Sequence, residues 1–198
     1  MIDKSSTLIV CALEKETNNQ LDDYNVLYTG VGKVNASMKL TKYLVTFGCP
    51  KLVVNYGTAG SRNIPIGDLV ECRRFMQTDM DVTALGLDIG VTPFENDIPK
   101  IIGDDIHHLI GDNSYYSRFY NREGLLCGSA DSFTTYVNKD LTKVDVYDME
   151  AYSLAKVCNH FNVPFVSFKY ITDNVNGDSQ GDWNSNFKKG IHKFKKVL

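Results

Sequence analysis

Long apolar runs and paired cysteine motifs are both missing from this sequence of 198 residues. No stretch approaches the roughly 20 apolar residues that a membrane-spanning helix needs, so we expect no membrane association. The five cysteines are scattered and none forms a C-x-x-C pair, which is typical of free thiols in a reducing compartment. The four histidines lack zinc-ligand spacing, and the first residues lack a signal-peptide pattern. We therefore expect a cytoplasmic protein without a structural metal.

The sequence also lacks a surplus of basic residues. Its formal net charge is -3 and its pI is near 5.8, which argues against a dedicated nucleic-acid binder. Hydrophobic residues make up 43% of the chain and charged residues 23%, as in ordinary globular proteins. No repeat, linker or low-complexity segment divides the chain. Its length suits one domain with a full core, which we expect to span residues 1–198.

Apolar strands alternate with amphipathic helices along the chain. Residues 7–13, 52–56 and 165–171 are nearly all apolar, as expected for strands that are buried on both faces. Residues 34–47 predict a helix that ends at Gly48. The remaining elements predicted by the same patterns are strands at residues 25–29, 69–75, 125–129 and 144–147, a helix from 149 to 161, and one last helix over residues 187–197 with a basic face.

Two acidic residues stand where rigid elements would present them to one crevice. Asp148 is a plausible N-cap, and Glu150 follows it in the first helical turn. Asp173 comes after strand 165–171, at the carboxyl end where ligands bind in open α/β sheets. Each has a plainer interpretation, because the helix dipole favours Glu150 and turns favour Asp173. Together they indicate a small-molecule site.

Glycine-rich stretches follow two predicted strands. Residues 30–33 (G-V-G-K) permit positive φ and close approach of a ligand, but both nucleotide-binding motifs fail there. Asn35 replaces the last glycine of G-x-G-x-x-G, and Val34 replaces the Ser or Thr of a P-loop. Residues 57–61 (G-T-A-G-S) predict a turn whose N–H groups, with the hydroxyl of Thr58, face a ligand.

Two longer stretches are harder to interpret. Residues 76–95 begin polar and rich in turn formers, and we interpret them as a surface excursion that covers a site or meets a partner subunit. Residues 96–123 give no clear pattern, and their aromatic side chains fit either stacking on a base or ordinary packing.

The ordered set of motifs resembles the nucleoside phosphorylase superfamily, and most closely its methylthioadenosine/S-adenosylhomocysteine nucleosidase branch. The resemblance implies a three-layer αβα domain with a mixed central sheet, no cofactor, and a homodimer that acts on a purine nucleoside. The matching stretches follow the family's order over most of the chain: residues 12–16, 30–34, 57–60, 66–68, 79–84, 131–133, 148–151 and 171–173.

The resemblance implies distinct roles for three carboxylates. Glu16 would activate a water, Asp173 would donate a proton to N7 of the purine, and Glu150 would accept hydrogen bonds from the ribose hydroxyls. Breaking an N-glycosidic bond builds positive charge on the sugar and negative charge on the base, so these groups would lower the barrier. The water attacks from the face opposite the base, as in inverting glycosidases. Asp173 can donate near neutral pH only if burial raises its pKa or water supplies the proton.

The resemblance implies substrate contacts for a second set of residues. Phe133 would stack on the base and Met149 would pack beneath the sugar. Lys169 stands where the family commonly has an arginine near the water. Leu85 and Leu87 stand where the family often has aromatics against the 5′ substituent, sometimes across a dimer. The remaining contacts, to the edges of the base and to the ligand above the sheet, would come from Thr134, Ala59, Gly60 and Thr58.

Three other functions remain open. A phosphorylase would use phosphate as the nucleophile, but Asn55 and Tyr56 stand where such enzymes carry an arginine, and the first loop offers residues 14–16 (E-K-E) instead. An acid beside the nucleophile repels phosphate, which favours hydrolysis. A nucleoside-binding protein without turnover would leave the three carboxylates without a task. Nucleic-acid binding through the basic last helix would depend steeply on salt.

Overall fold

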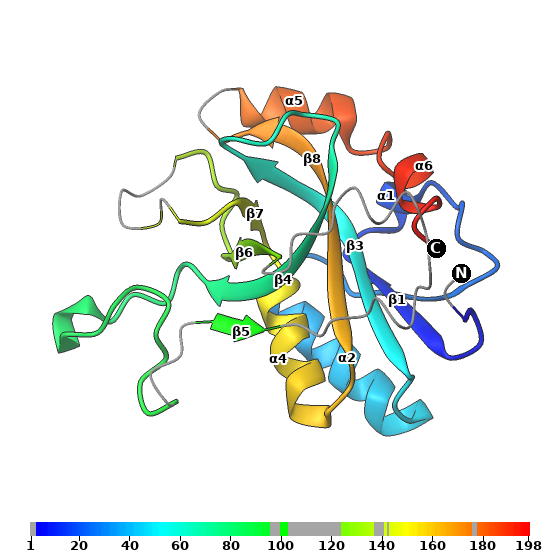
Figure 1. The fold of residues 1–198 in the computed structure, drawn as a ribbon, viewed down its shortest axis with the longest axis horizontal. Coiled ribbons are helices and arrows are strands. Elements are labelled where there is room, and N and C mark those ends of the chain that lie inside the picture. Colours follow the sequence, from blue (N-terminus) through cyan, green and yellow to red (C-terminus); the bar gives the residue numbers. More distant parts are fainter. Residues whose placement is uncertain (1–2, 96–99, 103–123, 137–140, 142, 176–177) are drawn as a thin grey trace.

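The computed structural model describes residues 3–95, 100–102, 124–136, 141, 143–175 and 178–198 (Figure 1). Its strands are β1 (Thr7–Cys11), β2 (Asn25–Tyr28), β3 (Leu52–Ser61), β4 (Leu69–Gln77), β5 (Lys100–Ile102), β6 (Leu125–Ser129), β7 (Val146–Asp148) and β8 (Phe165–Asn174). Its helices are α1 (Glu14–Thr17), α2 (Lys33–Phe47), α4 (Ala151–Phe161), α5 (Ser179–Asn186) and α6 (Ile191–Phe194), with a 3-10 turn η1 (Thr83–Leu85).

The strands form one mixed eight-stranded sheet. β1 pairs in parallel with β2 and β3, and β3 pairs in parallel with β8, which runs antiparallel to β4. Because β7 joins β3 to β6, and β6 joins β4, the strands β3, β8, β4, β6 and β7 close into a ring of pairings. The prediction of an α/β fold with a mixed central sheet is confirmed.

Helices cover both faces of this sheet (Figure 1). α2 and α4 pack together on one face, where Leu40 and Leu154 belong to one apolar core. On the other face, Phe194 of α6 stacks on Tyr56 of β3 with ring centroids 4.4 Å apart. Apolar side chains spaced four residues apart create the buried stripe of α2, which ends where Gly48 adopts a φ of 87°. This is the three-layer arrangement that the resemblance implies.

Three local predictions were wrong. Residues 57–61 form no turn but continue β3, because they pair with β8 along their length. The helix predicted over residues 187–197 is only the short α6, and α5 forms earlier, at Ser179–Asn186, where its Trp183 and Asn186 bond to the β3 and β8 strands. Asp148 ends β7, and Glu150 occupies the N-cap position of α4. Tertiary contacts, which local patterns do not encode, decide each of these.

Several other expectations concern exposure. Four of the five free cysteines are buried as expected, whereas Cys49 is exposed. Residues 76–95 lie largely at the surface, as predicted. Most of residues 96–123 lies outside the described residues, and only strand β5 is described there. Within the described part of the chain, no helix combines the length and apolar character needed to cross a membrane.

Candidate active site

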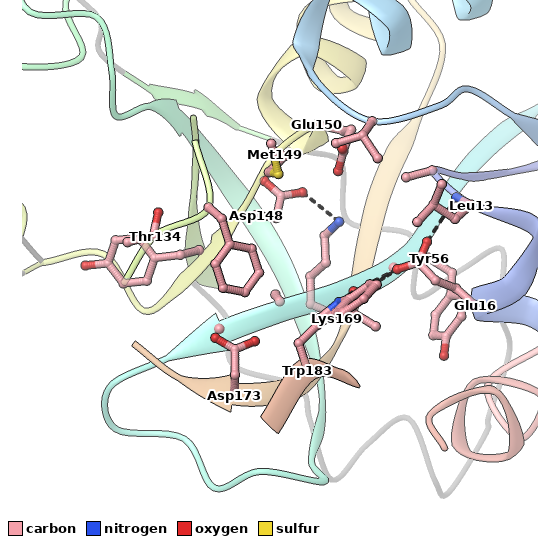
Figure 2. Close-up of a pocket in the computed structure, with 18 of the residues that line it drawn as sticks. Leu13, Glu16, Tyr56, Thr134, Asp148, Met149, Glu150, Lys169, Asp173 and Trp183 are labelled. Carbon is pink, nitrogen blue, oxygen red and sulfur yellow. Dashed lines mark hydrogen bonds and ion pairs between the residues drawn. The ribbon is translucent and has the colours of Figure 1, made fainter. Parts of the chain in front are cut away.

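A cavity of about 430 Å³ opens where the loops after β1 and β2 meet the carboxyl-terminal parts of β3 and β8 (Figure 2). Short elements with few local restraints, such as α1, are held there by their contacts with the long central strands. Leu85 and Leu87 do not line this cavity, but every residue that was predicted to catalyse or to contact the base, the sugar or the water does: Glu16, Thr58, Ala59, Gly60, Phe133, Thr134, Met149, Glu150, Lys169 and Asp173.

Glu16 lines the cavity and is oriented by three hydrogen bonds. It lies in α1, which follows β1 directly, and only 3% of its surface is exposed. Its Oε1 accepts from the amide of Thr58 at 3.1 Å and from the Thr58 hydroxyl at 2.7 Å. Its Oε2 accepts from the amide of Leu13 at 3.0 Å. Both carboxylate oxygens are held by these donors, which fixes the orientation of the group, as a general base requires.

Two glycines of β3 keep the cavity open beneath the carboxylates. A β-carbon at Gly57 would lie 3.3 Å from Nζ of Lys169 and 3.9 Å from Oε1 of Glu16. The ammonium and the carboxylate therefore border the same small space. A β-carbon at Gly60 would lie 2.7 Å from Oδ2 of Asp173, which is closer than real side chains allow. Only glycine fits at this position while Asp173 keeps its place.

Asp173 is presented by a shift in strand register. β3 and β8 pair regularly up to Ala59 and Ile171, and then Gly60 lies opposite Asp173 instead of Thr172. Irregularities of this kind commonly re-aim a side chain near a functional site. Oδ1 of Asp173 accepts a hydrogen bond from the Thr172 hydroxyl at 2.8 Å. Burial raises the pKa of Asp173, which is the direction that a proton donor needs.

Glu150 stands at the N-terminus of α4, close to the glycine loop after β2. Its Oε1 accepts a hydrogen bond from the amide of Gly32 at 2.9 Å. Burial, together with the negative charge of Asp148, raises the pKa of Glu150 to about 8. This shift favours the neutral acid, and additional hydrogen-bond donors or positive charge would favour the ionised form.

Lys169 forms a buried ion pair with Asp148, a residue whose importance the sequence did not reveal. Its Nζ lies 2.7 Å from Oδ2 of Asp148, and the two side chains are 1% and 0% exposed. Burial disfavours the charge of Asp148, but the Lys169 ammonium lowers the pKa of that carboxyl below its usual range. Asp148 also accepts hydrogen bonds from the Ser129 hydroxyl and from the amide of Ala151. A capping role alone does not explain this network.

Trp183 of α5 is the second cavity residue that sequence reasoning missed. Its indole Nε1 donates a hydrogen bond to the Thr58 hydroxyl at 3.0 Å (Figure 2). It is the only tryptophan of the chain, and that rarity in a polar loop was the one available signal. Among the described residues, no cluster of three or more His, Cys, Asp or Glu side chains is arranged to hold a metal ion.

An ion pair and two backbone hydrogen bonds join the start of α2 to the loops that carry Asp79 and Asp131. Lys33, at the start of α2, contacts both carboxylate oxygens of Asp79. Its amide donates to Oδ1 of Asp131 at 2.8 Å, and the amide of Asp131 donates to Asp79 at 2.8 Å. The loop that carries Phe133 is therefore anchored to the glycine loop beside Glu150.

Comparisons with known proteins agree with this geometry. The family model described as "Phosphorylase superfamily" matches residues 20–198. Named 5′-methylthioadenosine/S-adenosylhomocysteine nucleosidases of Haemophilus influenzae and Shewanella frigidimarina are each 32% identical to this chain, and each match covers 89% of this chain and 80% of the relative.

Solved structures share the fold. A Helicobacter pylori methylthioadenosine nucleosidase mutant with 5′-methylthioadenosine in its active site has a TM-score of 0.83 at 21% identity, covering 98% of this chain and 96% of its own. A futalosine hydrolase mutant from Helicobacter pylori has a TM-score of 0.81 at 19% identity, covering 96% and 97%. The chain belongs to the phosphorylase superfamily, in the branch of the 5′-methylthioadenosine/S-adenosylhomocysteine nucleosidases.

Proposed function

We propose that this protein hydrolyses the N-glycosidic bond of purine nucleosides of the 5′-methylthioadenosine/S-adenosylhomocysteine type. The relatives that carry this name support the reaction. The observation that carries the proposal is that Glu16, Glu150 and Asp173, all buried, line one cavity. Charge separation in the reaction needs acidic groups at the water, at the sugar and at the base, and the cavity offers one candidate for each.

On the side of the nucleophile, Glu16 removes a proton from a water molecule as the water oxygen bonds to C1′ of the sugar. The space next to Gly57, bordered by Glu16 and Lys169, suits this water. Glu150 accepts hydrogen bonds from the ribose hydroxyls, and its carboxylate stabilises the positive charge that develops on the ribose. This positive charge also favours the ionised form of Glu150 during the reaction.

On the side of the leaving group, Asp173 donates its proton to N7 of the purine while the bond between C1′ and N9 breaks. The base leaves as the neutral purine, and the sugar retains the hydroxyl that came from water. Glu16 then releases its proton to solvent and Asp173 takes one up, so the enzyme returns to its starting state. The raised pKa of Asp173 supports this role.

Other cavity residues hold the substrate. Phe133 stacks on the base and Met149 packs beneath the sugar. Lys169 adds positive charge near the water, and its pairing with Asp148 fixes where that charge lies. The edges of the base and the ligand above the sheet are contacted by Thr134, Ala59, Gly60 and Thr58, which all line the cavity.

Phosphorolysis is not favoured. Among the described residues that line the cavity, the cationic side chains are Lys15 and Lys169, and Lys169 is paired with Asp148. A phosphate dianion in the space beside Gly57 would face the carboxylate of Glu16 in a buried site, which is strongly repulsive. A neutral water has no such cost.

We further propose that the 198 residues form one domain and that the protein is a homodimer in the cytoplasm. Val34, Met38 and Val45 share one face of α2 and are 72%, 57% and 70% exposed, a stripe that a second copy would cover. Leu85 is also exposed and does not line the cavity of its own chain, which supports a contact across the dimer. Free buried thiols support a reducing compartment.

An assay of base release tests the reaction. The protein is incubated with adenosine, 5′-methylthioadenosine and S-adenosylhomocysteine, with and without phosphate, and the free base and the sugar product are quantified. We expect adenine and a reducing sugar at the same rate with or without phosphate. Formation of ribose 1-phosphate derivatives that requires phosphate would establish a phosphorylase, and tight binding of nucleoside without turnover would establish a binding protein.

A further inference from the structure

A chain of hydrogen bonds connects α5 to the carboxylate of Glu16. The indole Nε1 of Trp183 donates to Oγ1 of Thr58 at 3.0 Å, and this Oγ1 donates to Oε1 of Glu16 at 2.7 Å. The residues at its two ends are far apart in the sequence and lie in different elements, so the connection exists only in the folded protein.

The direction of each hydrogen bond follows from the donor inventory. An indole N–H can only donate, so it occupies a lone pair of the Thr58 oxygen. Among the described residues, the single hydroxyl proton of Thr58 is then donated to Glu16. A hydroxyl that accepts one hydrogen bond is also polarised to donate a stronger one. Trp183 therefore directs and strengthens the hydrogen bond from Thr58 to Glu16.

The indole is itself held in place from two sides. The ring of Phe187 stacks on Trp183 with centroids 4.8 Å apart and an interplanar angle of 14°. The ammonium of Lys15, the residue before Glu16, lies 5.2 Å from the Trp183 ring centroid and 5.4 Å from that of Phe187. Such cation–π contacts stabilise a ring orientation without consuming its N–H donor. The indole N–H that begins the chain of hydrogen bonds is therefore fixed relative to α1.

The same helix also supports the second carboxylate. Asn186, at the end of α5, donates to the carbonyl of Thr172 at 3.0 Å, and the Thr172 hydroxyl donates to Asp173 at 2.8 Å. Thus α5 contacts the hydrogen-bond partner of Glu16 at one position and that of Asp173 at another. This short helix is rich in polar residues and has few apolar side chains to bury. The hydrogen bonds of Trp183 and Asn186 therefore help to hold it against the strands.

We infer that Trp183 is a positioning residue for the water-activating carboxylate, acting through the hydroxyl of Thr58. This inference rests on the proposed role of Glu16. Glu16 has about four acceptor sites, of which Thr58 and Leu13 occupy three. Correct orientation of the remaining site towards the water is worth more in the transition state than in substrate binding, so Trp183 raises kcat more than it lowers KM.

The test is a double-mutant cycle. Trp183→Phe keeps an aromatic ring against Phe187 but removes the N–H. We expect kcat to fall about three- to tenfold, the scale of one hydrogen bond, with KM changed less than about twofold. In a Thr58→Val background, the same Trp183→Phe change leaves kcat unaltered, whereas in a Thr58→Ser background kcat falls as much as in the native protein.

Equal losses in the valine and native backgrounds would show that Trp183 acts by packing alone, and no loss in any background would also overturn the inference. A second readout is independent of turnover. Because Trp183 is the only tryptophan, the protein has a single indole N–H resonance. We expect it to move upfield in Thr58→Val and to shift between Glu16 and Glu16→Gln proteins. Absence of turnover by the native protein would contradict the proposed reaction. An indole resonance that does not move in these variants would separately contradict the hydrogen-bond chain from Trp183 through Thr58 to Glu16.

Discussion

The four buried acidic residues that line the cavity have different hydrogen-bond and charge partners. Glu16 receives three hydrogen bonds, and Asp148 receives an ammonium in addition to hydrogen bonds. Glu150 and Asp173 have fewer such partners, and burial therefore raises the pKa of both. Within one cavity, the pKa of Asp148 is therefore lowered, whereas the pKa values of Glu150 and Asp173 are raised.

Removing the charge of Glu16 tests its role as a base. We expect Glu16→Gln to lower kcat at least about a hundredfold, the scale of a general base, because an amide cannot accept a proton from water. The matched control is Glu14→Gln, which alters an exposed acid of the same helix that does not line the cavity. Steady-state base release measures both. A near-normal rate for Glu16→Gln would remove this residue from the mechanism.

Replacing Asp173 tests the acid. Asp173→Asn retains the shape of the side chain but cannot protonate the purine, so we expect kcat to fall at least about a hundredfold. Nucleosides whose base leaves readily without protonation should lose much less. Asp88→Asn, at an exposed acid outside the cavity, serves as the control. If poor and good leaving groups suffer the same loss, Asp173 has a different role.

The raised pKa of Glu150 predicts a dependence of stability on pH. Between its ordinary value of 4.5 and about 8, Glu150 holds a proton in the folded protein that it loses in the unfolded chain. The free energy of unfolding contributed by this group is therefore present at low pH and lost as pH rises through about 8, by an amount of the order of a few kcal/mol.

Chemical denaturation at pH 6 and pH 9 measures this contribution. We expect the native protein to lose more stability between the two values than Glu150→Gln does. The comparison isolates Glu150 because every other titrating group is the same in both proteins. Identical losses in the two proteins would contradict the raised pKa.

At the scale of elements, the parallel pairing of β3 and β8 decides where Asp173 lies. Both strands have ten residues, and they pair in parallel along nearly their whole length. The register shift at Gly60 brings Asp173 into the cavity, while Gly57 leaves space between Lys169 and Glu16. α1 and α5 are short, and they are held against these strands by side-chain hydrogen bonds to Thr58 and to the Thr172 carbonyl.

A methyl group at Gly60, where the register shifts, should disturb catalysis more than folding. In Gly60→Ala the new β-carbon would lie 2.7 Å from Asp173 and 2.8 Å from Val175, so both side chains must move. We expect kcat to fall at least about tenfold, because misplacement by about an ångström is costly in an oriented site. Base release and thermal melting are measured together. Loss of activity without a large fall in Tm supports the assignment, and unchanged kcat would show that Asp173 need not occupy its present position.

At the scale of the whole molecule, the two largest core clusters of the described residues lie on opposite faces of the sheet, and the helix layers differ in what they leave exposed. α2 buries Ala36, Leu40 and Leu44 but exposes the stripe of Val34, Met38 and Val45. Monomeric proteins rarely leave such a stripe uncovered on a regular helix. The cavity opens at the edge of the same layer, beside the loop that anchors Lys33.

Charges in the exposed stripe should separate the subunits. We expect Val34→Glu combined with Met38→Glu to convert the dimer to a monomer, because like charges would face each other across a two-fold interface. Light scattering at micromolar concentration gives the mass. Lys195→Glu, at an exposed residue on the other side of the sheet, is the control and should leave the dimer intact. A native protein of monomeric mass would contradict the proposed dimer.

Local patterns in the sequence were enough to find most elements. The apolar run at residues 7–13 became β1, and the four-residue spacing of apolar side chains became α2, because burial of one face is encoded in consecutive residues. The order of short motifs identified the family and the residues that line the cavity. These signals depend on residue type and spacing, which the chain carries by itself.

Pairings between distant residues were decided only by the tertiary structure. Asp148 was expected to cap a helix, but the fold also places it against Lys169, and Trp183 of α5 gained a partner in Thr58 of β3. The register shift that aims Asp173 depends on which strand lies beside β8. Each of these contacts joins elements that are far apart along the chain, and local residue patterns do not reveal which distant elements meet. The sequence therefore determined which chemical groups the site contains, and three-dimensional packing determined which group restrains which.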